Sequence, residues 1–155
     1  MKLAEALILR SDLKKRIEQL RGRLTRNVKV QEGDSPSEDP KELLAEFDRA
    51  AAEMEALIRR VNSTNANTLF DGDHRISDAI AMRDTLDLRI RVIRAVIDEA
   101  TGRERLFSRS EIKFVPTIDA AAMQKQLDEL SQKRRELDTR LQAANWQIDL
   151  LVTNL

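Results

Sequence analysis

Three arginines stand where a helical chain normally places apolar residues. Arg10, Arg83 and Arg134 interrupt seven-residue repeats of apolar side chains in three different expected helices. An unpaired arginine is costly to bury, so each must meet a carboxylate, reach solvent along its stem, or face a wet cavity. The structural interpretation is snorkelling or a polar layer that fixes helix register. The functional interpretation is an anion site inside a helical bundle.

The anion hypothesis adds polar residues from two neighbouring segments. The candidate binding residues are Asn62, Asn65, Thr68, Arg83 and Asp84. They would serve an enzyme or a small-anion binder in a cleft between the helices expected at 40–63 and 77–101. The asparagines and the threonine have a second explanation, because short polar side chains compete for backbone hydrogen bonds and end helices. Both interpretations stay open at the level of the sequence.

Other site chemistries find little support in the residue types. The single histidine, His74, lies in a polar turn beside Asp71 and Asp73 and has no second nitrogen ligand near it. The chain has no cysteine, which excludes thiolate metal sites and cysteine nucleophiles. It also lacks a glycine-rich phosphate loop and a G-x-S-x-G elbow. We therefore expect no catalytic residue, no metal and no cofactor.

A basic stretch late in the chain raises the question of nucleic-acid binding. Lys133, Arg134 and Arg135 are adjacent, but Glu136 and Asp138 follow at once, and the 27 basic and 27 acidic residues cancel. A neutral chain has no general attraction for a polyanion. The pattern indicates a solvated face with ion pairs, and nucleic-acid binding is the weaker alternative.

The elements that carry these residues are predicted to be helices. Charged residues make up 35% of the chain and aromatic residues 3%, a composition typical of helical bundles. Steps of three and four residues define an apolar seam through Ala120, Met123, Leu127, Leu130, Leu137, Leu141, Ala144, Ile148 and Leu151. The predicted fold is all-α, an antiparallel bundle of four long helices with coiled-coil-like packing.

The expected boundaries give one domain over residues 1–155. Helices are expected at 2–27, 40–63, 77–101 and 118–152, with a loop at 28–39 and an extended connector at 103–116. The start of the helix expected at 40–63 is marked by Asp39 as the N-terminal cap and by Pro40 as the first helical residue. Asp119 or Thr117 caps the last helix.

The helices carry more apolar surface than one four-helix package can hide. Side chains off the seams form additional faces, which are Leu7, Ile8, Leu88, Val92, Val96, Phe114 and Trp146. A helix with two separated apolar faces needs partners on two sides. We expect these residues to form the interface of a homo-oligomer, which makes the chain a non-enzymatic structural or interaction module.

The N-terminal run of apolar residues does not indicate a membrane protein. Glu5 interrupts it, no cleavage site follows, and it continues into an amphipathic helix. We expect neither a signal peptide nor a membrane span. A chain without cysteine is compatible with a reducing compartment, so the expected location is cytoplasmic.

Several blocks of the sequence together resemble a known family. They are MKLAEALILRSDL, VQEGDSPSEDP, LIRRVNSTNANT, AIAMRDTL, SRSEIKFVPTID and ELDTRLQAANWQIDLL, in this order and over nearly the whole chain. The chain resembles the septicolysin-like family of small uncharacterised bacterial proteins. The resemblance implies a helical protein and supplies no site residues.

Overall fold

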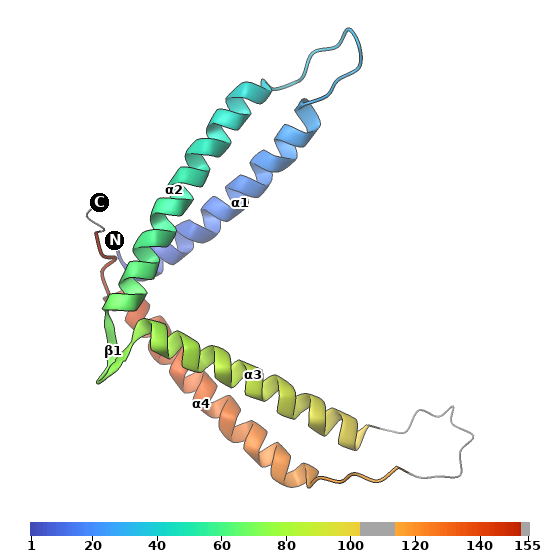
Figure 1. Cartoon of the computed structure of the whole chain (residues 1–155), viewed down its shortest axis with the longest axis vertical. Helices are drawn as coiled ribbons and strands as arrows, with labels where there is room; N and C mark the ends of the chain where they lie inside the picture. The colour runs from blue at the N-terminus through green and yellow to red at the C-terminus, as the bar shows by residue number, and fades with distance from the viewer. Residues whose placement is uncertain (103–113, 153–155) are drawn as a thin grey trace. The chain divides into compact units, whose positions relative to one another are not determined.

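The described part of the chain is mostly helical (Figure 1). The structure, a computed structural model, describes residues 1–102 and 114–152. The helices are α1 (Leu3–Asn27), α2 (Pro40–Asn67), α3 (Ile76–Thr101) and α4 (Ala120–Gln147). Two very short strands, β1 (Leu69–Asp71) and β2 (His74–Arg75), pair between α2 and α3. The predicted all-α fold of four long helices is confirmed.

The chain divides into two compact units, which we describe one at a time. Unit 1 comprises Met1–Leu69 and Ala143–Leu155, and unit 2 comprises Phe70–Gln142. Unit 1 contains the α1–α2 hairpin and unit 2 the α3–α4 hairpin; the two helices of each hairpin lie side by side (Figure 1). One domain over the whole chain stays a prediction.

Each hairpin buries the seam of its two helices. In unit 1, Leu20 of α1 packs with Leu43 and Ala50 of α2. In unit 2, Ile90 and Ile93 of α3 pack with Leu127 of α4. These residues follow the spacing of three and four that the sequence shows, because that spacing places side chains on one face of a helix. A two-helix hairpin covers each helix on one side and leaves the other sides open.

The starts of two helices follow the sequence signals. The Asp39 carboxylate accepts a hydrogen bond from the Lys41 amide (2.9 Å), with Pro40 as the first residue of α2. The Asp119 carboxylate accepts one from the Ala122 amide (3.0 Å) just before α4. Both caps satisfy amides that have no partner within the first helical turn.

The end of α2 differs from the expectation. The polar run that was expected to end the helix near residue 63 instead continues it to Asn67. The Thr64 hydroxyl donates to the Arg60 carbonyl (2.8 Å), and the Asn67 amide group donates to the Ser63 carbonyl (2.8 Å). These side chains bond back to their own helix, so they do not compete with its backbone pairing.

The last helix is shorter than expected, because α4 ends at Gln147 and not at 152. Residues 148–152, here called the C-terminal tail, leave the helix and pair within unit 1. The Leu3 amide donates to the Ile148 carbonyl (2.9 Å), and the Leu150 amide donates to the Met1 carbonyl (2.9 Å). The tail thereby exchanges helical hydrogen bonds for bonds to the N-terminus and buries Leu150.

Hydrogen bonds to Asn27 hold the second half of the loop at 28–39. Asn27, a buried residue at the end of α1, accepts hydrogen bonds from the Ser37 hydroxyl (2.9 Å) and the Glu38 amide (3.1 Å). Gly33 has a φ of 90°, a conformation that glycine adopts without strain. Most of the connector expected at 103–116 lies outside the described residues, and its residues 114–116 form no strand.

Candidate functional site

The two seam arginines of unit 2 form one ion-pair layer between α3 and α4. Arg134 of α4 donates to Asp87 of α3 (3.0 Å) and lies 3.5 Å from Asp138. Arg83 of α3 lies 3.9 Å from the other oxygen of Asp138 and 2.9 Å from Asp84. The layer joins both helices at one level, as a polar layer that fixes register does. The third seam arginine, Arg10, is exposed on α1.

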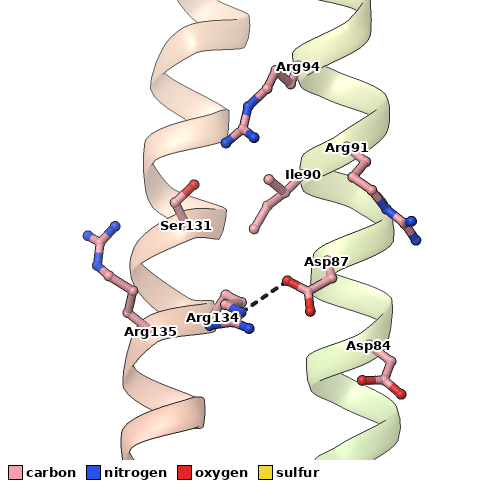
Figure 2. A pocket seen from close by; sticks show the side chains of 8 residues that line it. All are labelled: Asp84, Asp87, Ile90, Arg91, Arg94, Ser131, Arg134 and Arg135. Carbon is pink, nitrogen blue, oxygen red and sulfur yellow. Dashed lines mark hydrogen bonds and ion pairs between the residues drawn. The ribbon is translucent and has the colours of Figure 1, made fainter. Parts of the chain in front are cut away.

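A shallow groove lies beside this layer, between α3 and α4 of unit 2 (Figure 2). We call it the arginine groove, and it has a volume of about 740 Å³. It is lined by Asp84, Asp87, Ile90, Arg91, Arg94, Ser131, Arg134 and Arg135. Figure 2 shows Arg94 and Arg134 between the two helices, whereas the guanidinium groups of Arg91 and Arg135 point outwards, away from the space between the helices. Four arginines and two aspartates are among the lining residues, so positive charge is in excess.

The arginines of the groove differ in whether a carboxylate neutralises them. Arg134 is neutralised by Asp87, as Figure 2 shows. Arg91, Arg94 and Arg135 are exposed and form no ion pair with any residue of the described chain. Sequence analysis missed Arg91 and Arg94 because they lie off the seam. The only available signal was two arginines three residues apart on the helix that carries Arg83.

The five binding residues proposed from the sequence fall in different units. Thr68 and the two asparagines belong to unit 1, where Asn62 is exposed and Asn65 half-buried. Arg83 and Asp84 belong to unit 2 and pair with each other. A joint site of these residues stays a prediction.

The proposed interface residues include a continuous row on α3. Leu88, Val92 and Val96 are 54%, 55% and 38% exposed. With Ala81, Thr85 and Ala95, also exposed, they form a surface that we call the α3 apolar face. It points away from the side of α3 that holds Ile90 and Ile93 against α4, since residues 88, 92 and 95 fall on the opposite side of a 3.6-residue turn.

Other proposed interface residues are also accessible. In unit 1, Ile8 and Trp146 are each more than half exposed, whereas Leu7 is half-buried. Phe114, just before α4, is 80% exposed. Exposed large apolar side chains are costly in water when they gather in patches.

The turn between β1 and β2 is fastened to α4 inside unit 2. Arg140 pairs with Asp71, and its guanidinium lies 4.9 Å from the ring centre of Phe70. Asp71 also contacts His74 (3.1 Å), and the hydrogen bond from Arg140 holds the pKa of the Asp71 carboxyl below its usual value. Arg140 therefore has a structural partner within unit 2.

A second hollow lies at the loop end of unit 1 and has the opposite charge. Glu38, Asp39, Glu42 and Glu46 line it together with Arg23 and Arg49. The hydrogen bond between Arg23 and Glu38 raises the pKa of the arginine and lowers that of the glutamate. This pair ties the loop to α1 and occupies the charges that a ligand would need.

Two further classes of site, metal centres and membrane-spanning helices, find no support in the described chain. Among residues 1–102 and 114–152, no three histidine, aspartate or glutamate side chains are grouped so that they could hold a metal ion. In the same ranges, every helix is too short or too polar for a transmembrane segment.

Comparison with known proteins places the chain among uncharacterised relatives. A family model described as a family of unknown function, DUF6847, matches residues 10–150. A crystal structure of a functionally unknown conserved protein from Corynebacterium diphtheriae is 38% identical and superposes with a TM-score of 0.92. That alignment covers 97% of this chain and 99% of the other. The search of curated proteins finds no match.

Proposed function

The chain belongs to the DUF6847 family, and we propose that it is a non-enzymatic interaction module that associates with a second copy of itself through the α3 apolar face. The observation that carries this proposal is the exposure of Leu88 and Val92 in the middle of a well-formed helix. A row of aliphatic side chains on the outside of a hairpin gains free energy when another apolar surface covers it.

The spacing of the α3 apolar face favours a second α3 as the partner. Ala81, Thr85, Leu88, Val92 and Ala95 follow each other by four, three, four and three residues. This is the a and d spacing of a two-stranded coiled coil, in which Thr85 and Val92 take a positions and Leu88 takes d. Glu99 at the next a position ends the apolar row.

The charges beside this face fit a parallel pair. Asp84 precedes an a position and Arg89 follows a d position, which makes them a g and an e residue. In a parallel coiled coil, g of one helix approaches e of the next heptad on the partner, five residues further on. Asp84 would therefore meet the partner's Arg89, and symmetry forms this pair twice.

The first test is the mass of the native particle by light scattering at micromolar concentration. We expect a dimer mass for the natural chain and a monomer mass for Leu88→Glu/Val92→Glu. The control is Leu44→Glu on α2, which adds one of the two charges at a similarly exposed leucine (49%) and should leave the dimer intact. A monomer mass for the natural chain contradicts the proposal.

A charge exchange tests the orientation of the pair. Asp84→Arg and Arg89→Asp alone should each weaken the dimer about tenfold, because each turns two attractions of a few tenths of a kcal/mol into repulsions. The double variant should return to the natural affinity. Circular dichroism checks that each variant stays helical. If the double variant is as weak as the two single changes combined, Asp84 and Arg89 do not meet across the interface.

Three exposed residues outside the α3 apolar face extend the proposed assembly. Ile8, Trp146 and Phe114 are accessible for further contacts in a larger closed assembly. The alternative function is an enzyme or small-anion binder that uses the polar residues Asn62, Asn65, Thr68, Arg83 and Asp84. Nucleic-acid binding through Lys133 and the other basic residues of the last helix is the weaker alternative. The septicolysin-like resemblance and the cytoplasmic location stay predictions; the family match gives a family of unknown function.

A further inference from the structure

We propose that the arginine groove binds the dianionic phosphoryl group of a small molecule. The groove lies between α3 and α4, on a different side of α3 from the α3 apolar face. The two proposals share only Asp84, which lines the groove and flanks that face, so this inference does not depend on self-association. Its basis is the distribution of charge among the residues that line it. The proposal rests mainly on Arg94, whose guanidinium lies between the two helices, with Ser131 on the facing helix (Figure 2).

The carboxylates nearest to the groove are already engaged. Asp87 accepts from Arg134 (3.0 Å), and Asp84 pairs with Arg83 (2.9 Å), which lies outside the lining. A carboxylate that forms an ion pair with an arginine repels an incoming anion less than an unpaired carboxylate does. The positive charge of the other arginines is therefore available to a ligand.

Three arginines keep their full hydrogen-bonding capacity. Arg94 has an aspartate four residues later on the same helix, Asp98, yet the two form no ion pair in the described chain. Arg91 and Arg135 are similarly unpaired among the described residues. A guanidinium presents two parallel N–H donors that match the oxygens of a phosphoryl group. The Ser131 hydroxyl supplies a further donor from α4.

The charge and the dimensions of the groove indicate the class of ligand. Arg91, Arg94, Arg134 and Arg135 outweigh Asp84 and Asp87 by two charges, which equals the charge of a phosphate dianion. The volume of about 740 Å³ exceeds what one phosphate group fills, so the groove has room for an organic part beside the phosphoryl group. The floor includes Ile90, an apolar residue on which an organic part of the ligand can rest. A small phosphate monoester fits these features together.

The test is a titration of the isotope-labelled full chain by NMR. The probes are phenyl phosphate, inorganic phosphate and sulfate, and the reporters are the amides of Ile90 and Ser131. Saturable shifts with phenyl phosphate at pH 7.5 support the proposal. No saturable shift up to about 10 mM overturns it, since this concentration detects even a weak complex. Tighter binding of phenyl phosphate than of inorganic phosphate would identify an ester as the ligand, and equal binding would identify free phosphate.

A matched pair of variants locates the site. Arg94→Gln should weaken phenyl phosphate binding about tenfold, the loss of one charge-assisted contact of about 1.4 kcal/mol. Arg59→Gln makes the same change at an exposed position of α2 and should leave affinity within about twofold. Equal losses in both variants would show a general charge effect and overturn the site. A duplex DNA that binds more tightly than phenyl phosphate, with equal losses in both variants, would do the same.

The pH dependence separates the ligand's charge from the protein's. Arginines stay protonated throughout the neutral range, so their charge is constant. A phosphate monoester gains its second charge with a pKa of about 6. Binding of phenyl phosphate should therefore strengthen between pH 5 and pH 8, whereas binding of sulfate should not change. Parallel pH profiles for the two ligands would show that the groove does not select a dianion.

The neutral variant Leu88→Gln/Val92→Gln removes the apolar row without adding a charge three residues from Arg91, so it separates this proposal from self-association. None of the residues that line its arginine groove is altered, so it should bind phenyl phosphate as the natural chain does. A monomeric natural chain that still binds phosphate would refute self-association alone. A dimer without phosphate binding would refute the groove alone.

Discussion

The sharpest stability prediction concerns Leu150, the one buried side chain of the C-terminal tail. Leu150 is 5% exposed, although it lies near the end of the chain and outside any helix. Its amide donates to the Met1 carbonyl (2.9 Å), so the side chain is held on unit 1 by its own backbone. The perturbation is Leu150→Ala, which keeps the backbone bond and removes the buried isobutyl group.

The expected cost follows from the burial of that group. A fully buried leucine that becomes alanine loses about 2–5 kcal/mol. Leu150 lies in a short tail that can relax around the cavity, so we expect about 2 kcal/mol, at the low end of this range. Val152 is two residues further on and 77% exposed, which makes Val152→Ala the matched control with a change below about 0.5 kcal/mol.

The assay is urea unfolding, followed by circular dichroism and by the fluorescence of Trp146. This single tryptophan lies in unit 1, at the last turn of α4 just before the tail, so it reports on that region. Leu150→Ala should shift the tryptophan transition to lower urea. Equal midpoints for Leu150→Ala and Val152→Ala would refute the reasoning, because the tail would then contribute no burial.

Three further predictions concern polar contacts of unit 1. Thr64→Val should lower the free energy of unfolding by about 1–3 kcal/mol, because the Leu151 amide loses the hydroxyl that accepts its hydrogen bond (3.0 Å). Hydrogen exchange of the Leu151 amide should become faster in this variant, whereas Thr64→Ser, which keeps the hydroxyl, should retain the protection. Asn27→Ala should cost about 1–3 kcal/mol in urea unfolding, since two donors of the following loop lose a buried acceptor; an unchanged midpoint would contradict this. The hydrogen bond from Lys2 lowers the pKa of the Asp149 carboxyl in the folded chain. This contact therefore stabilises the fold fully above the usual aspartate pKa of about 3.9, and the stabilisation is lost as the pH falls through the lower folded value. Asp149→Asn should abolish this acid-dependent part of the free energy of unfolding, measured by urea unfolding at several pH values.

The fold was largely predictable because its signals are local. Asp39 and Asp119 mark helix starts through cap contacts within three residues, and the seam spacing identifies the faces that pack. The two errors at helix ends have distant or ambiguous causes. The tail leaves α4 to pair with Met1 and Leu3, which no pattern near residue 148 reveals. Thr64 carries a side chain that either ends a helix or bonds back to it.

The candidate sites were predictable in part for the same reason. The unusual seam positions of Arg83 and Arg134 are visible in the sequence, and Asp138, four residues after Arg134, is a visible partner. The arginine groove is not visible, because it requires the rotation of α3 relative to α4. Arg91 and Arg94 gain significance only when Ser131 and Arg135 lie across from them.

Helix α3 serves three surfaces at once, and the hairpin explains why. Its partner α4 covers the side that carries Ile90 and Ile93, which leaves the remaining circumference open. Asp87 lies at the border of that core and takes Arg134 from α4, so the ion pair closes the core and removes a negative charge from the groove beside it. The side furthest from α4 then carries Leu88 and its apolar neighbours. Because the ion pair that fixes register also occupies Arg134, Asp87→Asn should weaken the hairpin and at the same time free this arginine for phosphate. Weaker hairpin stability together with stronger phosphate binding would be two opposite effects of one substitution, which a purely structural role for the layer would not produce.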